Sequence, residues 1–365
     1  MPSVVSLFSG GGGLDLGFIS AGYRILWAID NNENAVNTYR KNIGNHIKCA
    51  DITMENVQNI PHADIIIGGP PCQSFSLAGM RNVEDARGQL VWQYMKILKA
   101  VQPKAFVFEN VTGLLSAKNS NGEKIVDLLK EAFKDIGYNV EMQVMNAADY
   151  GVPQRRRRVI IVGLKNGHFT FPLATHGNSS EGLIPYISVK QALDDLGAPV
   201  NDENGVVEYR CPPQNNYQRT IRTQDMVTEH FMPRMSELDK YICSHVRPGG
   251  NYNDIPNDVP SERIRRLQRD GGHTTCYGRM LPDEPSYTIN TYFNRPNVGC
   301  NIHYSQDRLI TVREALRLQS FPDSYQIVSS SKQGRNLIVG NAVPPLLAKV
   351  IAVELKKIFV RQIYD

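Results

Sequence analysis

A cysteine that follows two glycines and two prolines is the first candidate for chemistry in this 365-residue chain. Residues 65–76 read IIIGGPPCQSFS, so Cys72 comes directly after an apolar run and a stretch of backbone that prolines stiffen. A free cysteine is more often a small buried hydrophobe than a nucleophile. Here polar side chains follow it, so we expect an exposed thiol on a held loop, with the thiolate as the reactive form.

A carboxylate and a run of arginines are the next candidates. Glu109 ends the apolar stretch FVFENV, where a carboxylate is costly unless it is hydrogen-bonded or takes part in proton transfer. The run QRRRR at 154–158 is typical of a solvated surface or of a contact with a polyanion. Strand-like alternation predicts Arg156 and Arg158 on one side and Arg155 on the other. One side could then meet a small ligand while the other faces a phosphate backbone.

A glycine-rich loop, LFSGGGGLDLGF at 7–18, follows the first apolar run and allows a ligand to approach the backbone closely. A tight turn without a ligand is the alternative. Asp15 stands where the dinucleotide fingerprint has its third glycine, and an acid there is unfavourable beside a pyrophosphate. We therefore expect a nucleoside cofactor without phosphates. Asp30, about 20 residues beyond the loop, suits ribose hydroxyls; a helix N-cap before NENAV is its other possible role.

Short apolar runs alternate with helical stretches in the first half of the chain, which predicts an α/β fold of the Rossmann-like kind with a mostly parallel sheet. The expected strands are 4–8, 24–29, 46–50, 64–68, 104–109, 138–145 and 158–164, and the expected helices are 32–43, 88–101 and 122–136. Ligands of such sheets bind beyond the carboxyl ends of the strands. Ser9, Asp30, Asp51, Cys72 and Glu109 should therefore meet at one edge.

The alternation fades between 199 and 303, where Pro, Asn, Arg and Tyr accumulate, and this predicts a smaller, irregular domain. Regular structure resumes at 311–321, a helix with Val312, Ala315, Leu316 and Leu318 on one face, and at 341–359, an apolar final helix. We expect one domain from 1–198 and 304–365 and a second from 199–303.

Composition narrows the class of protein. A net charge of +4 permits a polyanionic partner without requiring one. The six cysteines show no spacing typical of a zinc site or a disulfide framework, so we expect no metal and a reducing setting. We found neither a signal peptide nor an apolar run near the ~18 residues that span a bilayer. These features predict a cytoplasmic protein without a membrane partner.

Together the motifs resemble those of the DNA (cytosine-5)-methyltransferases, in that family's order. They are FSGGG, the acids Asp30 and Asp51, GGPPCQSFS, ENV, QRRRR, VREALRLQSFPDSY and GNAVPP. The resemblance covers 4–164 and 304–355 and leaves the middle unmatched, as expected for the family's variable target-recognition domain. It implies that 1–198 and 304–365 form the catalytic and cofactor-binding domain and that 199–303 read the DNA.

The resemblance implies S-adenosylmethionine as the cofactor, with Phe8 against the adenine, Asp30 on the ribose and Asp51 near the adenine amino group. Asn341 would lie near the methionine end. Gly10, Gly12 and Pro70 complete the implied cofactor site. Two positions depart from the family's usual residues: Asp30 replaces a common glutamate, and Ala342 a frequent serine.

The implied reaction is methylation of carbon 5 of a cytosine in a specific double-stranded DNA sequence, on a base flipped out of the helix. Cys72 would add to carbon 6. Glu109 would protonate ring nitrogen 3, and Arg156 and Arg158 would hold the carbonyl at position 2. The candidate DNA-binding residues are Gln73, Ser76, Arg155, Arg263, Arg265, Arg266, Arg269, Arg279 and Thr288. For the arginines of 262–269, a solvated helix face is the alternative.

The partners implied are double-stranded DNA and, for a bacterial restriction-modification enzyme, a functionally paired endonuclease without a stable complex. A tRNA cytosine-5 methyltransferase shares the catalytic set, although Ser74 stands where that branch tends to carry proline. A nicotinamide oxidoreductase is favoured only by the glycine loop and Asp30, and it leaves Cys72, Glu109 and the arginines without a joint purpose. A binding module without catalysis is disfavoured by the many reactive groups at the strand ends on one side.

Overall fold

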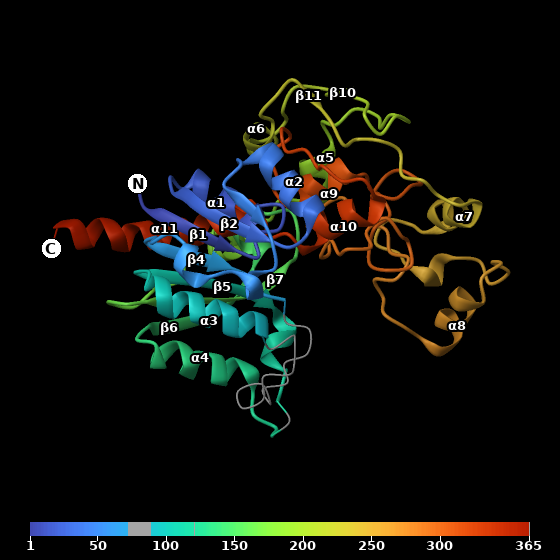
Figure 1. The fold of residues 1–365 in the computed structure, drawn as a ribbon. Coiled ribbons are helices and arrows are strands. Elements are labelled where there is room, and N and C mark those ends of the chain that lie inside the picture. Colours follow the sequence, from blue (N-terminus) through green and yellow to red (C-terminus); the bar gives the residue numbers. More distant parts are fainter. Residues whose placement is uncertain (72–88, 120, 365) are drawn as a thin grey trace. The chain divides into compact units, whose positions relative to one another are not determined.

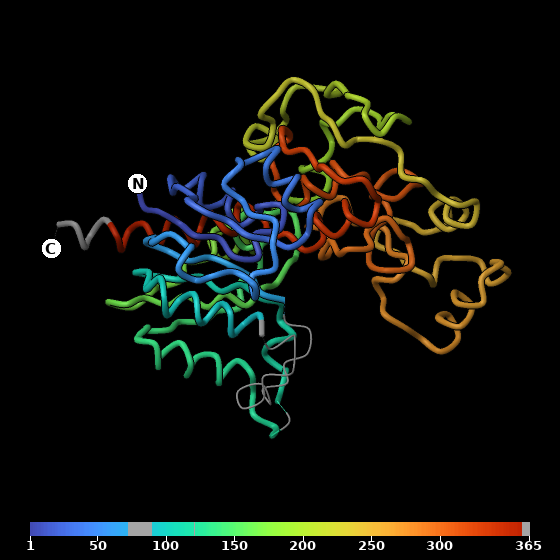
Figure 2. The backbone as a smooth tube through the Cα atoms, viewed as in Figure 1, coloured from blue at the N-terminus to red at the C-terminus, as the bar shows by residue number. Residues whose placement is uncertain are grey.

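The computed structural model describes residues 1–71, 89–119 and 121–364. Its contacts divide the chain into two compact units, which Figure 2 traces along the backbone. Unit 1 comprises Met1–Asn146, Arg157–Leu173 and Pro345–Asp365; unit 2 comprises Ala147–Arg156 and Ala174–Pro344. This division falls elsewhere than the expected limits of 199 and 303. Those limits concern the part that reads DNA, and they remain a prediction.

Unit 1 contains a seven-stranded sheet in the order β3-β2-β1-β4-β5-β7-β6 (Figure 1). Its strands are β1 (Ser3–Leu7), β2 (Arg24–Asp30), β3 (Ile47–Cys49), β4 (Ile65–Gly68), β5 (Ala105–Val111), β6 (Asn139–Asn146) and β7 (Arg157–Leu164). The first five pair in parallel, and β7 runs antiparallel to both of its neighbours. The expectation of a mostly parallel sheet is confirmed.

The helices of unit 1 are α1 (Gly13–Ser20), α2 (Glu33–Asn42), α3 (Gln89–Val101), α4 (Ile125–Asp135) and α11 (Pro345–Tyr364). Alternate strand residues share one buried core with α3 and α4, in which Tyr94 and Phe133 pack against Phe106 and Phe108. On α1, a side chain at Gly17 would come within 2.3 Å of Ala348 on α11. Glycine there lets the two helices pack closely.

The C-terminal part of the chain differs from expectation. The stretch Lys332–Phe359 is long and apolar enough, by length and composition alone, to cross a membrane, which the sequence analysis missed. Its helix is interrupted at 342–344, and 61% of its most apolar window is buried inside the protein. This is the pattern of a core helix. The expected helix at 341–359 is likewise wrong at its start, because Asn341 ends α10 and α11 begins at Pro345.

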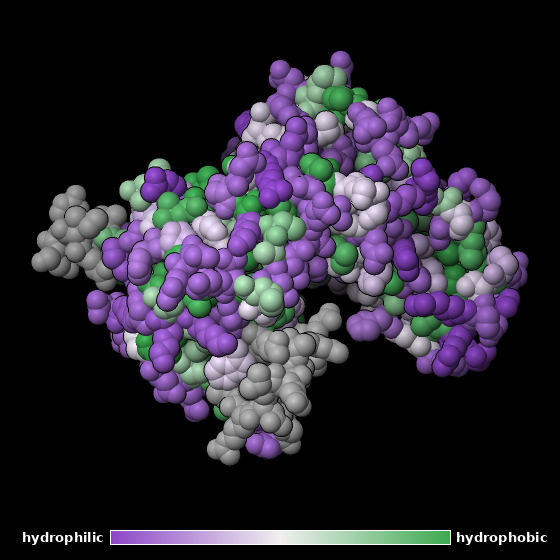
Figure 3. Space-filling model, viewed as in Figure 1, coloured by the Kyte–Doolittle hydropathy of each residue, from purple (hydrophilic) through white to green (hydrophobic). Residues whose placement is uncertain are grey.

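Unit 2 combines short helices with long irregular segments. Its helices are α5 (Val189–Leu193), α6 (Asn216–Ile221), α7 (Glu237–His245), α8 (Glu262–Asp270), α9 (Val312–Leu318) and α10 (Lys332–Asn341). Its strands are the paired β8 (His176–Gly177) and β9 (Ile184–Pro185), and β10 (Val207–Glu208) and β11 (Met226–Val227). Residues between 242 and 309, among them Ile242, Tyr252, Ile264 and Ile302, form a core cluster. Hydrophilic residues predominate on the face in Figure 3, with apolar ones scattered among them.

Helix α9 is more deeply buried than its apolar face predicts. All seven of its residues are buried, including two arginines and a glutamate. A buried charge is unfavourable unless it is paired, and Arg317 pairs with two carboxylates, Asp195 at 2.5 Å and Asp323 at 2.6 Å. Arg308 pairs with Glu314 at 2.7 Å in the same way. The motif VREALRLQSFPDSY therefore builds a buried ionic network inside unit 2.

Candidate active site and cofactor loop

A side-chain hydrogen bond joins the segment after β4 to the end of β5. Asn110 Nδ2 donates a hydrogen bond to the carbonyl oxygen of Pro70 at 3.0 Å, two residues before Cys72. A side chain at Gly69 would come within 2.6 Å of Glu109 Oε2, so the absence of a Cβ lets the chain pass close to this carboxyl group. Cys72, Gln73, Ser74 and Ser76 themselves lie outside the described residues.

Glu109 forms an ion pair with Arg158 in unit 1. The Nε of Arg158 lies 2.9 Å from Glu109 Oε1, and each side chain is only 11% exposed. The two residues are diagonal neighbours on the antiparallel β5–β7 pair, because Arg158 lies opposite Val111 and Glu109 lies opposite Ile160. The guanidinium fixes the position of the carboxyl group and offsets the negative charge that proton donation would leave on it.

Arg156 has a different environment from the one expected. Its side chain is fully buried in unit 2, where Nη1 donates to the carbonyl of Ile289 at 2.9 Å and Nη2 to that of Gly340 at 2.8 Å. The alternation argument that grouped it with Arg158 is wrong, because β7 begins only at Arg157. A guanidinium that is committed to two backbone carbonyls holds chain segments together, so the expected contact with the substrate has no support here.

Gln154 begins the run QRRRR, and the sequence analysis assigned it no role. It is fully buried; its Oε1 accepts a hydrogen bond from the backbone of Ile289, and its Nε2 donates to the carbonyl of Leu318. Thr288, a candidate DNA-binding residue, donates from Oγ1 to the carbonyl of Arg155 at 2.8 Å, a contact within unit 2. No local sequence signal could have found these contacts, since the partners are far away in the chain.

The glycine-rich loop leads from β1 into α1. Phe8, Gly10 and Gly12 have positive φ angles of 56°, 56° and 86°, and Gly12 is the N-cap of α1. At Gly10 no atom lies within 4 Å of the place a Cβ would take, so the backbone faces open space there. Glycine adopts such φ values more readily than other residues, and the open space at Gly10 leaves room for a ligand.

Asp30 ties the end of β2 to this loop. Its Oδ2 accepts a hydrogen bond from the backbone N–H of Gly10 at 2.8 Å, and its Oδ1 accepts one from Asn32 at 2.8 Å. Burial raises the pKa of Asp30, and the backbone hydrogen bonds act in the opposite direction. The N-cap alternative for Asp30 is wrong, because Asn32 caps α2 by accepting from Ala35. The hydrogen bond to Gly10 fixes Asp30 beside the glycine-rich loop, where a carboxylate can bind ribose hydroxyls.

Asp15 points into the protein and not toward a ligand. It is fully buried and accepts hydrogen bonds from Ser6 Oγ and Tyr39 Oη, both at 2.9 Å. Burial raises the pKa of Asp15 to about 6. The argument that this acid would repel a pyrophosphate is therefore wrong as made, since the carboxyl group does not reach the surface of the loop. The open space at Gly10 and the carboxylate of Asp30 still fit a nucleoside.

Two further residues expected to bind the cofactor are exposed. Asp51 Oδ1 accepts hydrogen bonds from the N–H and the hydroxyl of Thr53, both at 2.8 Å, and caps a short turn at the end of β3. Asn341 is the last residue of α10 and belongs to unit 2. Contact of either residue with a cofactor remains a prediction.

Comparison with known proteins decides the family. Residues 3–357 match the family described as C-5 cytosine-specific DNA methylase. The chain belongs to this family. The enzyme therefore transfers a methyl group to carbon 5 of cytosine in DNA, and the resemblance inferred from the motifs is confirmed.

Similar proteins cover nearly the whole enzyme. The type II methyltransferase M.NgoFVII of Neisseria gonorrhoeae is 37% identical over 98% of this chain and 87% of its own. M.AgeI of Thalassovita gelatinovora, also a type II methyltransferase, is 32% identical over 96% of this chain and 98% of its own. A solved E. coli structure, described as a DNA modification methyltransferase from a prophage, covers 99% of this chain with a TM-score of 0.74 and 23% identity. This likeness shows that the enzyme shares that fold.

Arg279, expected to contact DNA, is an internal residue of the enzyme. It is 5% exposed and donates hydrogen bonds to the carbonyls of Cys243, Val246, His303 and Gln306, and it pairs with Asp307 at 2.6 Å. A single arginine fork thus satisfies four backbone acceptors. The guanidinium is already used within unit 2, so these contacts give no support to the prediction that Arg279 binds DNA.

The other arginines that were expected to bind DNA lie on the surface. On α8, Ile264 is the buried residue, whereas Arg263, Arg265, Arg266 and Arg269 are exposed. Three of these side chains pair with acids of the same helix, at 3.1 Å for Arg265 with Glu262 and at 3.7 and 2.9 Å for Arg266 and Arg269 with Asp270. Such exposed pairs are weak and leave the arginines able to meet phosphates. Arg155 is also exposed, beside Glu284 and over the Tyr186 ring.

Proposed function

We propose that the enzyme modifies one cytosine of a specific double-stranded sequence, as the methylating member of a type II restriction-modification system. The names of its relatives and the exposed arginines of unit 2 support this proposal. The system would include an endonuclease that acts on the same sequence without a stable complex, in the cytoplasm of a prokaryotic cell. A tRNA substrate has less support, since the matching family is one of DNA methylases.

The Glu109–Arg158 pair, beside the chain that leads into Cys72, is the observation that carries the proposed mechanism. The thiolate of Cys72 forms a bond to carbon 6 of the cytosine. The carbon 5–carbon 6 electron pair shifts into the ring, and nitrogen 3 accepts a proton from Glu109. Carbon 5 becomes an enamine carbon, which is a far better nucleophile than in the intact base.

S-adenosylmethionine, when bound, supplies the electrophilic methyl group for carbon 5. As carbon 5 takes this group, nitrogen 3 returns its proton to Glu109. A base then removes the proton from carbon 5, the carbon–sulfur bond breaks, and the thiolate of Cys72 leaves with the double bond restored. Arg158 keeps Glu109 in place and stabilises its carboxylate during this cycle. The target base must leave the duplex to reach Cys72, at a cost of a few kcal/mol.

The glycine-rich loop would hold the cofactor. Asp30 reaches the loop through Gly10 and is placed to accept hydrogen bonds from ribose hydroxyls. The open space at Gly10 allows the nucleoside to lie against the backbone. The full proposed set of cofactor-binding residues is Phe8, Gly10, Gly12, Asp30, Asp51, Pro70 and Asn341.

The test is transfer of labelled methyl groups to duplex DNA and to tRNA, followed by bisulfite sequencing of the modified DNA. We expect incorporation into duplex DNA alone and one modified cytosine in one recurring sequence. Incorporation into tRNA and not into DNA would overturn the proposal in favour of the RNA alternative.

A further inference from the structure

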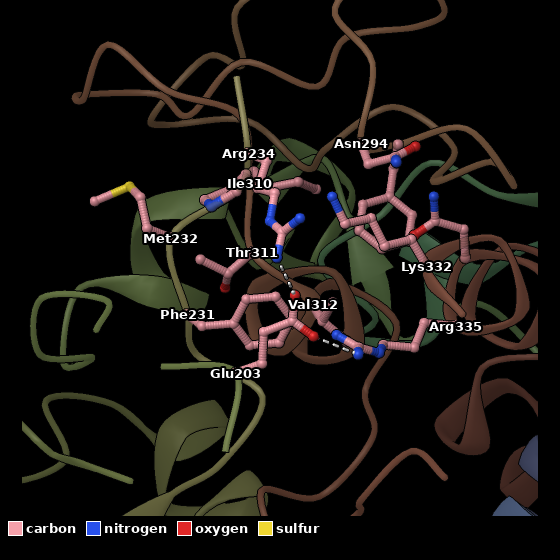
Figure 4. A pocket seen from close by; sticks show the side chains of 13 residues that line it. Glu203, Phe231, Met232, Arg234, Asn294, Ile310, Thr311, Val312, Lys332 and Arg335 are labelled. Atoms are coloured by element: carbon pink, nitrogen blue, oxygen red, sulfur yellow. Dashed lines mark hydrogen bonds and ion pairs between the residues drawn. The ribbon is translucent and has the colours of Figure 1, made fainter. Parts of the chain in front are cut away.

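A cavity in unit 2 lies between the beginnings of α9 and α10 (Figure 4). It has a volume of about 500 Å³, counting the part open to solvent. Phe231 and Val312 form an apolar part of the cavity wall. The guanidinium carbon of Arg335 lies 5.2 Å from the centre of the Phe231 ring. Neither the catalytic nor the cofactor assignments use any residue of this cavity.

Positive charge exceeds negative charge in the cavity lining. Arg234, Lys332 and Arg335 face a single acid, Glu203. Arg335 Nη2 lies 2.6 Å from Glu203 Oε2, and Arg234 Nη2 lies 3.8 Å from Oε1, as the dashed lines in Figure 4 show. The strongest cause of the lowered pKa of Glu203 is its hydrogen bond from Arg335. One carboxylate cannot neutralise three cations, so the described lining has an excess of two positive charges.

The start of α10 adds to this excess. Ser331 caps the helix by accepting a hydrogen bond from the backbone of Gly334 at 3.0 Å. The first turn contains no acidic residue and instead carries Lys332 and Arg335. Cations near the positive end of a helix are unfavourable, whereas an anion bound there is stabilised by the helix dipole and the first N–H groups. This arrangement favours a bound anion.

One amide side chain at the cavity also lacks a partner. Asn336 is 5% exposed and lines the cavity, and its side-chain amide has no hydrogen bond to any other described residue. Its Nδ2 can therefore donate to a ligand in the cavity. Asn336 and Lys332 are four positions apart on α10, so their side chains lie on the same helix face and can act on one ligand.

We propose that this cavity binds a phosphate group. Lys332 and Arg234 supply charge, the amide of Asn336 donates a hydrogen bond, and Glu203 keeps Arg335 oriented. The dipole of α10 adds to the positive potential at its first turn. A tetrahedral phosphate presents acceptors in several directions, which suits donors that come from a side-chain ammonium, a guanidinium and an amide. The phosphate belongs either to the backbone of bound DNA, which rests on the proposed function, or to a free phosphate compound.

The first experiment measures how duplex binding depends on salt. Each phosphate neutralised contributes a slope of about 0.9 in log K against log salt. Lys332→Gln should reduce the slope by about that amount if DNA supplies the phosphate. The control is Lys190→Gln, which removes an exposed lysine of unit 2 that does not line the cavity; its slope should equal that of the unaltered enzyme.

The second experiment measures thermal unfolding with inorganic phosphate and with sodium chloride at equal ionic strength. If the source is a free phosphate, the unaltered enzyme should gain several degrees from phosphate, and Lys332→Gln and the isosteric Asn336→Asp should lose the gain. In Asn336→Asp the new carboxylate repels the anion, while the nearby cations allow the variant to fold.

A reduced slope identifies DNA as the source, and phosphate stabilisation that depends on Lys332 and Asn336 identifies a free compound. If Lys332→Gln changes neither the slope nor the response to phosphate, the proposal is overturned. Methylation of duplex DNA by the unaltered enzyme is measured in parallel. Failure of that reaction would refute the proposed function, whereas the phosphate experiment would still decide the cavity.

Discussion

The guanidinium of Arg158 contacts the carboxyl group of Glu109 at 2.9 Å across the β5–β7 pair, where both side chains are nearly buried. This contact joins two motifs that lie about fifty positions apart, ENV and QRRRR, within a single strand pair. The same carboxyl group lies next to Gly69, so the pair stands beside the chain that enters Cys72. If Arg158 acts by positioning Glu109, the two residues are one catalytic unit.

Variants of this pair should therefore have non-additive effects. We expect Glu109→Gln to lower kcat by about 10²- to 10⁴-fold, since it removes the proton donor. Arg158→Gln should also lower kcat, and the double variant should be little worse than Glu109→Gln alone, because the arginine acts through the acid. Single-turnover methylation measures all three. Arg157→Gln, an exposed neighbour, is the matched control; losses that simply multiply would show that the two residues act independently.

Substitutions at Arg279 and Arg263 should differ in their effects on stability and on DNA binding. Arg279→Met leaves four backbone carbonyls and Asp307 without their arginine partner, so we expect a loss of about 3–5 kcal/mol in the free energy of unfolding. Arg263→Met, on the exposed face of α8, should change it by less than about 0.5 kcal/mol and weaken DNA binding. Chemical denaturation and a binding assay on the same samples measure both effects. Equal stability of the two variants would contradict the internal role of Arg279.

His303 should make unit 2 sensitive to acid. Burial is the main cause that lowers the pKa of His303 from 6.5 to about 4; Glu314 acts in the opposite direction, and Arg308, Arg279 and His230 lower it further. The unfolded chain binds the proton more tightly, so stability should fall as pH drops from about 6.5 to 4, by about 3 kcal/mol. Unfolding curves across this range measure the loss. In His303→Asn the free energy of unfolding should depend less on pH across this range. An unchanged pH profile would count against His303 as the cause of the loss.

Asp15, in unit 1, should give stability the opposite dependence on pH to that of His303. Burial raises the pKa of Asp15 to about 6, so its folded form favours the proton more than the unfolded chain does. Stability is then complete below about pH 4 and decreases as pH rises toward 6, by about 3 kcal/mol. Asp15→Asn removes the charge and preserves hydrogen bonds to the hydroxyls of Ser6 and Tyr39. We expect this variant to be more stable at pH 7 and little changed at pH 4; the same gain at both pH values would disprove the explanation.

Local patterns were sufficient to predict the sheet and the position of Glu109. Strands of unit 1 are short apolar runs bounded by turn residues, and parallel pairing brings their carboxyl ends to one edge, where Asp30 and Glu109 were expected. The Asp30–Gly10 hydrogen bond follows from that geometry, since the loop after β1 lies next to the end of β2.

Contacts between distant segments could not be predicted from one sequence. Arg156 donates to carbonyls 133 and 184 positions away, and the sequence around it resembles a solvated basic run. Arg279 similarly joins segments up to 36 positions away. An arginine that binds backbone carbonyls and one that binds phosphate use the same donors, so burial alone distinguishes them, and burial here depends on tertiary packing.

The most direct test of the central claim is covalent trapping on a duplex that carries 5-fluorocytosine at the target position. Fluorine cannot leave carbon 5 as a proton does, so the adduct should persist in the presence of S-adenosylmethionine. We expect a stable protein–DNA complex whose peptide map places the bond at Cys72, and no such complex with Cys72→Ser, which should still bind DNA. Methylation by Cys72→Ser at the rate of the unaltered enzyme, or an adduct at another residue, would contradict the account.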